Sequence, residues 1–201
     1  MKINTTAKLR ETYGYPSGRT KEKVLSNLDK HAVNFIEKSP FLIMSTSSIK
    51  GKLDASPRGG VPGFVHIRDE NTILIPDSKG NNRVDSLSNI VETGTIGLLF
   101  LIPGMDETLR INGKAYVSNA TEDLSLFMSE KNQPKACVIV EVEELFLHCA
   151  KALMRSKLWD EKSKINRNDM PSMGQMLKDQ LNSNEPAETH DAMLKRYEPD
   201  L

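Results

Sequence analysis

The sequence predicts a mainly β fold of the α+β class, a closed antiparallel barrel with peripheral helices. Short apolar or alternating runs recur between residues 41 and 148, and turn residues separate them. Helical patterns stand in front of these runs and in two of the connections between them. The length of 201 residues suits one domain with extensions and a real hydrophobic core.

The chain divides into three predicted parts: an N-terminal extension over 1–40, a barrel domain over 41–160, and a polar C-terminal extension over 161–201. The first part contains one amphipathic helix, predicted over residues 21–38. Its apolar face consists of Val24, Leu25, Leu28, Ala32, Phe35 and Ile36. The helix should end at Ser39, because the residue before a proline avoids the helical region.

The predicted strands are 41–47, 53–59, 64–69, 72–77, 95–102, 108–119 and 135–148. The run 95–102 is apolar on both faces and should be a central, buried strand. Asn112-Gly113 leaves two alternatives open, a two-residue hairpin turn or a bulge that bends one long strand. The extra Glu144 shifts the alternation of the last run and suggests another bulge there.

Further helices are predicted at 83–92, 121–131, 149–159 and 173–182, followed by a loose tail. The first should bury Val84, Leu87, Ile90 and Val91 and end at Thr93-Gly94, and the second should bury Leu124, Phe127 and Met128.

Composition argues against several classes of partner. Lys+Arg and Asp+Glu both number 27, so the net charge of zero gives no bulk attraction to nucleic acid or an anionic membrane. No apolar signal region opens the chain, and no apolar run approaches membrane-spanning length. The two cysteines do not match a zinc-site spacing. We therefore expect a soluble, cytoplasmic protein with no metal.

The stretch "IPDSKGNNRVDSLSNI", residues 75–90, is the first candidate binding site. Ser78, Lys79, Asn82 and Arg83 precede or begin a predicted helix, whose free N–H groups favour a negative charge. Two cations there oppose the usual preference for acids, and a bound phosphate would resolve that conflict. The alternative is a solvated loop in which Asn81 or Asn82 caps the helix.

Ser56 and Arg58 form a second candidate. They lie two residues apart in a predicted strand, so both side chains point to one face. Gly59-Gly60 then allows the backbone to approach a ligand closely. The alternative is an edge strand with a solvated arginine, which Pro57 favours.

Two basic segments are further candidates. Thr108, Arg110 and Asn112 share one strand face, so Arg110 points to solvent, a cleft or a partner subunit. Lys151, Arg155, Ser156 and Trp159 cluster on the helix predicted at 149–159 and could flank an anionic or aromatic ligand. The alternatives are a surface arginine and a solvated basic face.

No nucleophile elbow, HExxH, Walker or dinucleotide-binding motif occurs, and no convincing general acid–base pair is present. The catalytic residues are therefore unknown. Candidate sites rich in cations and amides favour an anionic cofactor that carries the chemistry itself.

Four segments together resemble the pyridoxamine 5′-phosphate oxidase-like family of FMN-binding split barrels, and within it a subgroup of probable FMN-dependent enzymes. They are "DASPRGGVPGFV", "ILIPDSKGNNRVDSLSNI", "IGLLFLIPGMDETLRINGKA" and "FLHCAKALMRSKLW", and they cover most of residues 40–160. The resemblance implies a six-stranded antiparallel split β-barrel and a homodimer with two FMN molecules between the subunits. It also favours the bent strand at Asn112-Gly113 over a hairpin.

The resemblance also implies roles for single residues. Ser56 and Arg58 run along the flavin. The FMN phosphate is held by Lys79, Asn82 and Arg83, with Ser78 as a further hydrogen-bond donor, while Pro76 and Asp77 pass near the cofactor. Thr108 and Arg110 approach from the interface, and Lys151, Arg155, Ser156 and Trp159 flank the flavin or its substrate.

The sequence departs from the oxidases proper in two respects. Their pair of basic residues at the helix start matches Asn82-Arg83, so one cation is replaced by an amide, for which Lys79 compensates. Their C-terminal arginine-and-histidine pattern is missing, which leaves the substrate open. We expect an FMN-dependent oxidoreductase, with NADH or NADPH as reductant. The alternatives are a non-catalytic module that binds or senses FMN or haem, and a protein that works through its dimer surface.

Overall fold

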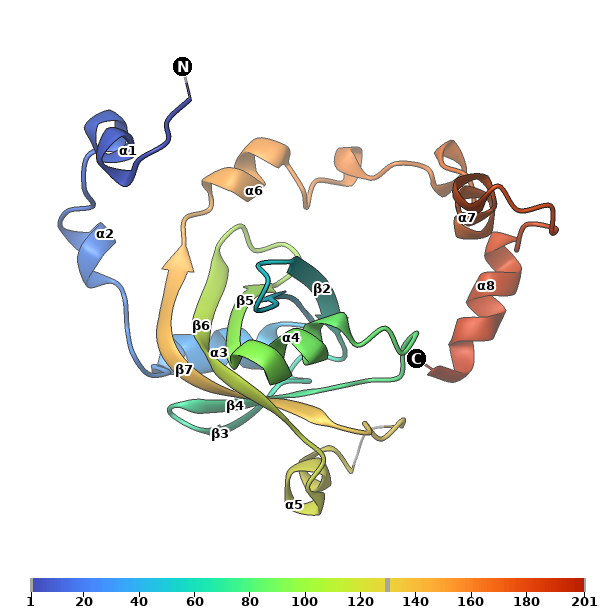
Figure 1. Ribbon diagram of the computed structural model, residues 1–201, viewed down its shortest axis with the longest axis horizontal. Coiled ribbons are helices and arrows are strands. Elements are labelled where there is room, and N and C mark those ends of the chain that lie inside the picture. Colours follow the sequence, from blue (N-terminus) through green and yellow to red (C-terminus); the bar gives the residue numbers. More distant parts are fainter. Residues whose placement is uncertain (1, 129–130, 201) are drawn as a thin grey trace.

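The computed structural model describes residues 2–128 and 131–200, and its centre is one strongly curved antiparallel sheet (Figure 1). The strands are β1 (Phe41–Ser47), β2 (Leu53–Gly59), β3 (His66–Asp69), β4 (Thr72–Pro76), β5 (Thr95–Leu101), β6 (Thr108–Ser118) and β7 (Cys137–His148). Their order is β2-β1-β5-β6-β7-β4-β3. The predicted mainly β split-barrel class is confirmed, with seven strands in the sheet where the family resemblance implied six.

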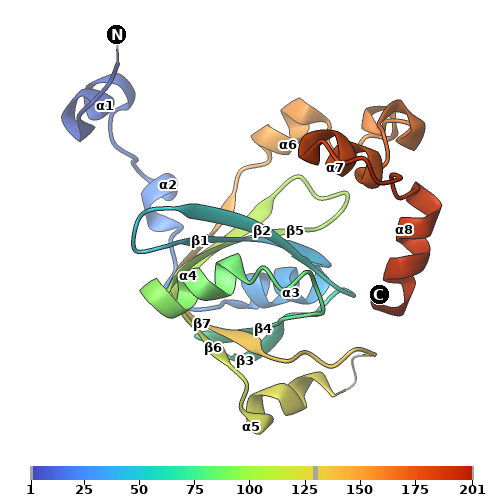
Figure 2. The same cartoon turned by 45° about the vertical axis from the view of Figure 1, so that its right-hand side comes forward.

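Helices surround this sheet. They are α1 (Thr6–Tyr13), α2 (Arg19–Glu22), α3 (Lys30–Lys38), α4 (Asp85–Thr93), α5 (Thr121–Leu124), α6 (Lys151–Ser156), α7 (Met173–Leu181) and α8 (His190–Tyr197). Short 3₁₀ turns cover Ser125–Phe127, Glu161–Ser163, Arg167–Asp169 and Glu198–Asp200. α3 and α4 lie against the barrel, whereas α1 and the segment from α6 to α8 arch away from it (Figures 1 and 2).

The predicted helix over 21–38 is wrong in its first half. α3 begins only at Lys30, because the Asp29 side chain caps it by accepting hydrogen bonds from the N–H groups of His31 and Ala32. Leu25 instead pairs with Leu145 of β7 through two backbone hydrogen bonds of 2.9 and 2.8 Å. Its helical spacing from the later apolar residues is therefore coincidental.

The hydrophobic core fills the concave side of the sheet. Ile36 of α3, Leu42 of β1, Phe100 of β5 and Ile111 of β6 are fully buried there. β5 is central, as predicted, but its convex face is only half-buried: Leu99 and Leu101 stay partly exposed.

These residues belong to a larger apolar surface, which we call the convex patch. It consists of Phe41, Ile43, Leu53, Pro57, Leu99 and Leu101 on β1, β2 and β5. Strand register aligns Pro57, Ile43, Leu99 and Arg110 in one row across four strands.

β6 and β7 pair along almost their whole length and contain a bulge where one was predicted. Asn112 faces Glu144, but Gly113 faces Val142, so the extra residue is Glu143 and not Glu144 as expected. The hairpin alternative at Asn112-Gly113 is therefore excluded. A side chain at position 113 would collide with the backbone carbonyl group of Glu141, which explains the glycine.

The buried face of α4 agrees with the prediction in part. Ile90 is buried and Leu87 packs against the core as predicted, whereas Val84 and Val91 are 50% and 75% exposed and Ser86 and Asn89 are buried instead. Burial of Asn89 is possible because its amide donates a 3.0 Å hydrogen bond to Thr46 on β1.

The helix predicted over 121–131 is shorter than expected. α5 and the following 3₁₀ turn end at Phe127, which is buried as predicted, but Met128 is 68% exposed. Residues 129 and 130, near the end of that prediction, lie outside the described residues. The predicted helix at 173–182 is confirmed as α7, and the tail that was expected to be loose contains α8.

No helix in the described part of the chain is long and apolar enough to cross a membrane. Within the same residues, no cluster of histidine, cysteine and acidic side chains could hold a metal ion.

We predict that Gly113→Ala lowers the free energy of unfolding by about 1–3 kcal/mol, because the new methyl group must displace the β7 backbone. Urea unfolding measures this loss. The control is Lys114→Ala, which removes only an exposed pair with Glu143 at 3.8 Å and should change stability by less than about 1 kcal/mol. Equal effects of the two substitutions would contradict the role given to the glycine.

Candidate functional site

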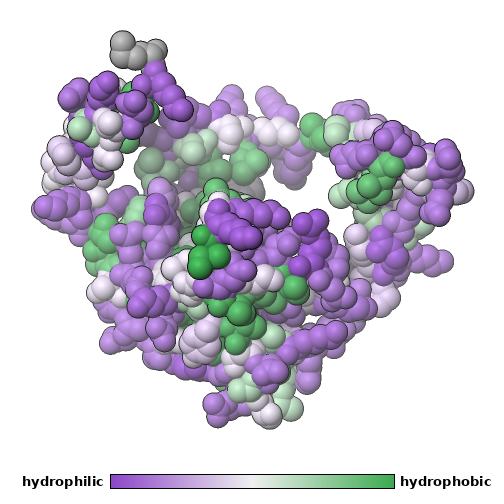
Figure 3. All heavy atoms as spheres, viewed as in Figure 1, coloured by the Kyte–Doolittle hydropathy of each residue, from purple (hydrophilic) through white to green (hydrophobic). Residues whose placement is uncertain are grey.

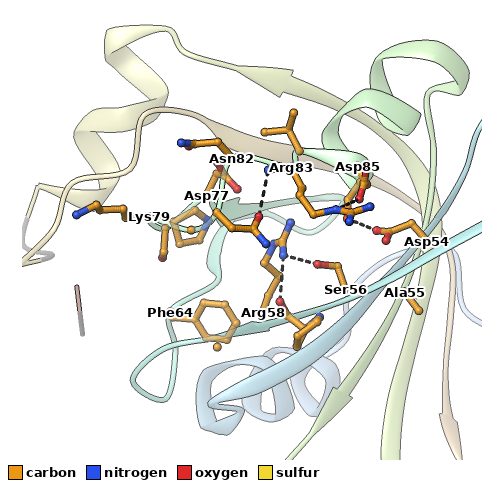
Figure 4. Close-up of a pocket in the computed structure, with 18 residues that line it drawn as sticks. Asp54, Ala55, Ser56, Arg58, Phe64, Asp77, Lys79, Asn82, Arg83 and Asp85 are labelled. Carbon is orange, nitrogen blue, oxygen red and sulfur yellow. Dashed lines mark hydrogen bonds and ion pairs between the residues drawn. The ribbon is translucent and has the colours of Figure 1, made fainter. Parts of the chain in front are cut away.

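A cavity of about 440 Å³ opens between β2, the end of β4 and the loop that leads into α4 (Figure 4). Its walls come from residues 54–59, Phe64 and residues 76–86. β2 and β4 lie near opposite ends of the strand order, so the curvature of the sheet brings them together.

Eight of the predicted site residues line this cavity: Ser56, Arg58, Pro76, Asp77, Ser78, Lys79, Asn82 and Arg83. The two strongest sequence candidates, the β2 pair and the polar stretch after β4, therefore form one site. Thr108, Arg110, Lys151, Arg155, Ser156 and Trp159 do not line it.

Arg58 points from β2 into the cavity (Figure 4). Its Nη1 donates hydrogen bonds to Ser56 Oγ at 2.6 Å and to the Pro57 carbonyl oxygen at 3.0 Å. Among the described ion pairs, none involves Arg58. Its guanidinium is therefore held in place by neutral acceptors, and its charge remains available to an anion.

The loop before α4 has an unusual backbone. Asn82 and Val84 have φ angles of 58° and 49°, in the left-handed region that a β-branched valine rarely adopts. Asn81 Oδ1 accepts a hydrogen bond from the Arg83 N–H group, which closes a local turn. Val84 stands at the N-cap of α4 and no side chain caps the helix, so the alternative that Asn81 or Asn82 caps it is wrong. The first-turn N–H groups therefore remain open to a ligand.

Arg83 is partly neutralised within the chain. Its Nε donates a 2.8 Å hydrogen bond to Asp85, the acid in the first turn of α4, which raises the pKa of Arg83. The charge conflict inferred from the sequence is thus weaker than expected, because Asp85 supplies the acid that the helix dipole favours. Both side chains are well exposed, so solvent screens the pair and an anion can compete for Arg83.

Asp77 is a half-buried acid of the cavity whose pKa is shifted. Burial raises the pKa of its carboxyl group, and the positive charge of Arg58 partly offsets that rise. Its own N–H group donates a 2.9 Å hydrogen bond to the Ala136 carbonyl oxygen, which fixes the end of β4. Asp77 therefore favours its neutral form more than an exposed aspartate does.

Sequence reasoning missed several residues of the site. Asp54 shares the inward face of β2 with Ser56 and Arg58 and accepts a hydrogen bond from Ser86, so the two-residue period of the strand could have revealed it. Arg196, Tyr197 and Asp200 line a second cavity of about 570 Å³ beside Lys79. No local pattern in the sequence points to these three.

The remaining candidates lie elsewhere. Arg110 lies on the convex face of the sheet, 5.3 Å from the centre of the Phe146 ring and 3.2 Å from Asn112 Oδ1, to which it donates a hydrogen bond. Thr108 is buried at the start of β6. On and after α6, Lys151, Arg155 and Ser156 are exposed, and the Trp159 indole donates to the Met105 carbonyl oxygen at 2.9 Å.

Comparison with known protein families shows to which family the chain is related. The family model described as pyridoxamine 5′-phosphate oxidase matches residues 28–149, more than half of the chain. The chain belongs to the pyridoxamine 5′-phosphate oxidase family. The match covers α3, every strand of the sheet and the candidate cavity, and it stops before α6.

Two solved structures are similar to this pyridoxamine 5′-phosphate oxidase family member. HupZ of Group A Streptococcus is 18% identical with a TM-score of 0.50, covering 60% of this chain and 93% of that chain. A candidate pyridoxamine 5′-phosphate oxidase of Lactobacillus delbrueckii is 17% identical with a TM-score of 0.48, covering 61% and 95%. At 18% identity, the likeness to HupZ concerns the fold alone. A search of curated proteins found no significant match.

We predict that Asp77→Asn stabilises the protein at neutral pH. Since the pKa of Asp77 is raised on folding, the stability linked to its protonation is present below the ordinary pKa of 3.8 and is lost as the pH rises through the folded-state pKa. The variant has no such loss, so its unfolding midpoint should exceed that of the wild type at pH 7 and approach it in acid. Thermal unfolding between pH 3 and pH 7 measures the difference.

The control for this prediction is Glu107→Gln, which removes an exposed carboxylate outside the cavity. Its stability difference from the wild type should stay small across the same pH range. A pH-independent effect of Asp77→Asn would contradict the assignment.

Proposed function

We propose that the chain binds FMN in the 440 Å³ cavity and acts as an FMN-dependent oxidoreductase. One observation carries this proposal: Arg58, Lys79 and Arg83 line one cavity together with hydroxyl and amide groups, beside the uncapped start of α4. Such an arrangement suits a phosphate group. Membership of the pyridoxamine 5′-phosphate oxidase family supports the choice of a flavin phosphate.

The residues present fit that group. The cavity volume lies within the range of about 300–1,000 Å³ typical of cofactor sites. Three carboxylates, Asp54, Asp77 and Asp85, also line the cavity. Asp85 pairs with Arg83, Asp54 accepts a hydrogen bond from Ser86, and burial raises the pKa of Asp77, a rise that the positive charge of Arg58 partly offsets. No described ion pair involves Arg58, so its positive charge is available to the phosphate, whereas Lys79 pairs with Asp200 at 2.6 Å and the phosphate competes for it.

In this proposal, Lys79 and Arg83 neutralise the phosphate, and Ser78 and Asn82 donate hydrogen bonds to it. Arg58 and Ser56 extend along the rest of the cofactor from β2, near Pro76 and Asp77. When bound, FMN supplies hydride and electron transfer, with NADH or NADPH as the proposed reductant. The protein side chains bind and orient the cofactor, and the substrate remains open.

Haem is a poorer fit to the same cavity. Haem iron is held by histidine, cysteine, methionine or tyrosine. None of these types occurs among the described residues that line the 440 Å³ cavity. A non-catalytic FMN-binding module is the remaining alternative, because the cavity shows no general acid–base pair.

We further propose that the protein is a homodimer with FMN at the subunit interface. The convex patch leaves Leu53 79% and Phe41 37% exposed, and exposed apolar patches often mark protein interfaces. Hydrophobic residues exposed over the barrel are visible among hydrophilic ones in Figure 3. Edge strand β2 presents Pro57 to the convex patch and Arg58 to the cavity, so interface and cavity adjoin.

A dimer would also give a role to the predicted site residues that lie outside the cavity. Arg110 lies in the same cross-strand row as Pro57 and Ile43, so a subunit seated on the convex patch would meet it. Thr108 and Arg110 would thereby approach the cofactor site of the second subunit. Lys151, Arg155, Ser156 and Trp159 would flank the flavin or its substrate from α6.

We predict that purified protein is yellow and that Lys79→Ala combined with Arg83→Ala weakens FMN binding by about tenfold or more, because two charged partners of the phosphate are lost. Flavin fluorescence quenching on titration gives the dissociation constant. The matched control, Lys50→Ala with Lys52→Ala, removes two exposed cations from the β1–β2 turn and should leave binding unchanged. A colourless wild-type protein that does not take up added FMN would refute the proposal.

Anaerobic titration with NADH and NADPH separates the two FMN-binding alternatives. Loss of the oxidised flavin absorbance supports an oxidoreductase and identifies the preferred nicotinamide. A bound flavin that neither nicotinamide reduces favours the non-catalytic module.

We predict that Leu53→Glu converts the dimer to a monomer, because it places a charge in the proposed apolar interface. Light scattering at several protein concentrations measures the native mass. Val91→Glu is the matched control, since Val91 is 75% exposed on α4, away from the convex patch. A monomeric wild type, or equal behaviour of the two variants, would count against the dimer.

A further inference from the structure

The C-terminal segment 190–200 returns to the mouth of the candidate cavity (Figure 2). Arg196, Tyr197 and Asp200 form one wall of the second cavity of about 570 Å³, and the opposite wall includes Arg58 and Lys79. Both cavities share Arg58 and Lys79, so the C-terminal segment lies directly beside the proposed cofactor site.

Among the described residues, polar contacts attach the end of this segment to the barrel side of the protein. Asp200 Oδ1 lies 2.6 Å from Lys79 Nζ, and the Asn132 amide donates a 3.1 Å hydrogen bond to the Pro199 carbonyl oxygen. The Asp200 side chain is 30% exposed and that of Lys79 66%. The Asp200 carboxylate therefore pairs with Lys79, the same lysine that binds the phosphate in the proposed function.

The segment is ordered internally but weakly anchored. Thr189 caps α8, and Arg196 makes two 2.8 Å contacts with Glu188, which keep the last turns of the helix in a defined shape. Yet α8 buries none of its residues, so little apolar surface becomes exposed to water when the helix moves as a unit. Such a segment can leave its position at low cost.

We propose that residues 190–200 form a displaceable strap, in which the Asp200 carboxylate competes with the anionic group of the ligand for Lys79. This rests on the proposed function, since the anion is the phosphate of the cofactor. A carboxylate and a phosphate on one ammonium group repel each other, so binding of the phosphate displaces Asp200 and opens the strap. Without the phosphate, the ion pair closes the strap over the mouth of the cavity.

The competition between Asp200 and the phosphate is weak, because the Lys79–Asp200 ion pair is partly exposed to solvent. A partly exposed ion pair contributes little, so the closed strap weakens anion binding by a small factor, about two- to fivefold. The strap therefore tunes affinity and controls access, and it does not block the site.

The test uses the full-length protein and inorganic phosphate as the probe. Asp200→Asn should bind phosphate about two- to fivefold more tightly than the wild type, because no carboxylate competes. The matched control is Glu185→Gln, which removes the same charge from an exposed residue of the same extension. Calorimetric titration at low ionic strength gives the dissociation constants, and added salt should reduce the difference.

A second readout does not depend on any ligand. Modification of Lys79 by an amine-reactive reagent, followed by peptide mass spectrometry, should be faster in Asp200→Asn than in the wild type and unchanged in Glu185→Gln. Added phosphate should then slow the modification in every variant. Equal phosphate affinities for wild type and Asp200→Asn would overturn the strap, even if the labelling rates differ, and so would an absence of phosphate binding.

These outcomes separate the strap from the flavin. If all three proteins bind FMN equally and phosphate equally, the strap is wrong and the proposed cofactor stands. If Asp200→Asn shows tighter phosphate binding but no protein binds FMN, the strap stands and the proposed cofactor is wrong.

Discussion

The curvature of the sheet is the constraint on which the site depends. β2 and β4 lie near opposite ends of the strand order, yet both line one cavity, so the sheet must curl until they meet. The long β6–β7 pair provides this bend at the bulge, where Glu143 is extra and Gly113 lets the two backbones come close. The proposed cofactor binding is thus linked to a glycine far along the chain from the cavity.

Local sequence patterns predicted most of the fold, because each strand and each turn depends on a few residues that are close together in the sequence. Arg58 and Ser56 were placed correctly by alternation alone, and the bulge at Gly113 was one of the two alternatives. Helix limits were less certain: Leu25 matched the helical period of α3, but Asp29 caps the helix after it, and tertiary pairing with Leu145 takes Leu25 into a bridge. The tail contact between Asp200 and Lys79 joins residues 121 positions apart, and no local pattern encodes it.

Electrostatics of the site are balanced rather than simply positive. Arg83 forms an ion pair with Asp85, Lys79 forms one with Asp200, and Arg58 donates hydrogen bonds to a hydroxyl and a carbonyl group. Internal partners of this kind keep cationic side chains ordered before a ligand arrives, at the cost of some affinity. The proposed strap is the one such partner that comes from outside the barrel.

Pro57 has a further consequence for the behaviour of the protein in solution. β2 is an edge strand, and an exposed edge invites strand addition by another chain and hence fibrous aggregation. Proline lacks the N–H group that a continuing ladder would need, and it interrupts the free edge of β2 near its middle. Copies of this chain are therefore discouraged from joining edge to edge, and the apolar face of the same strand remains the surface on which a finite assembly can close.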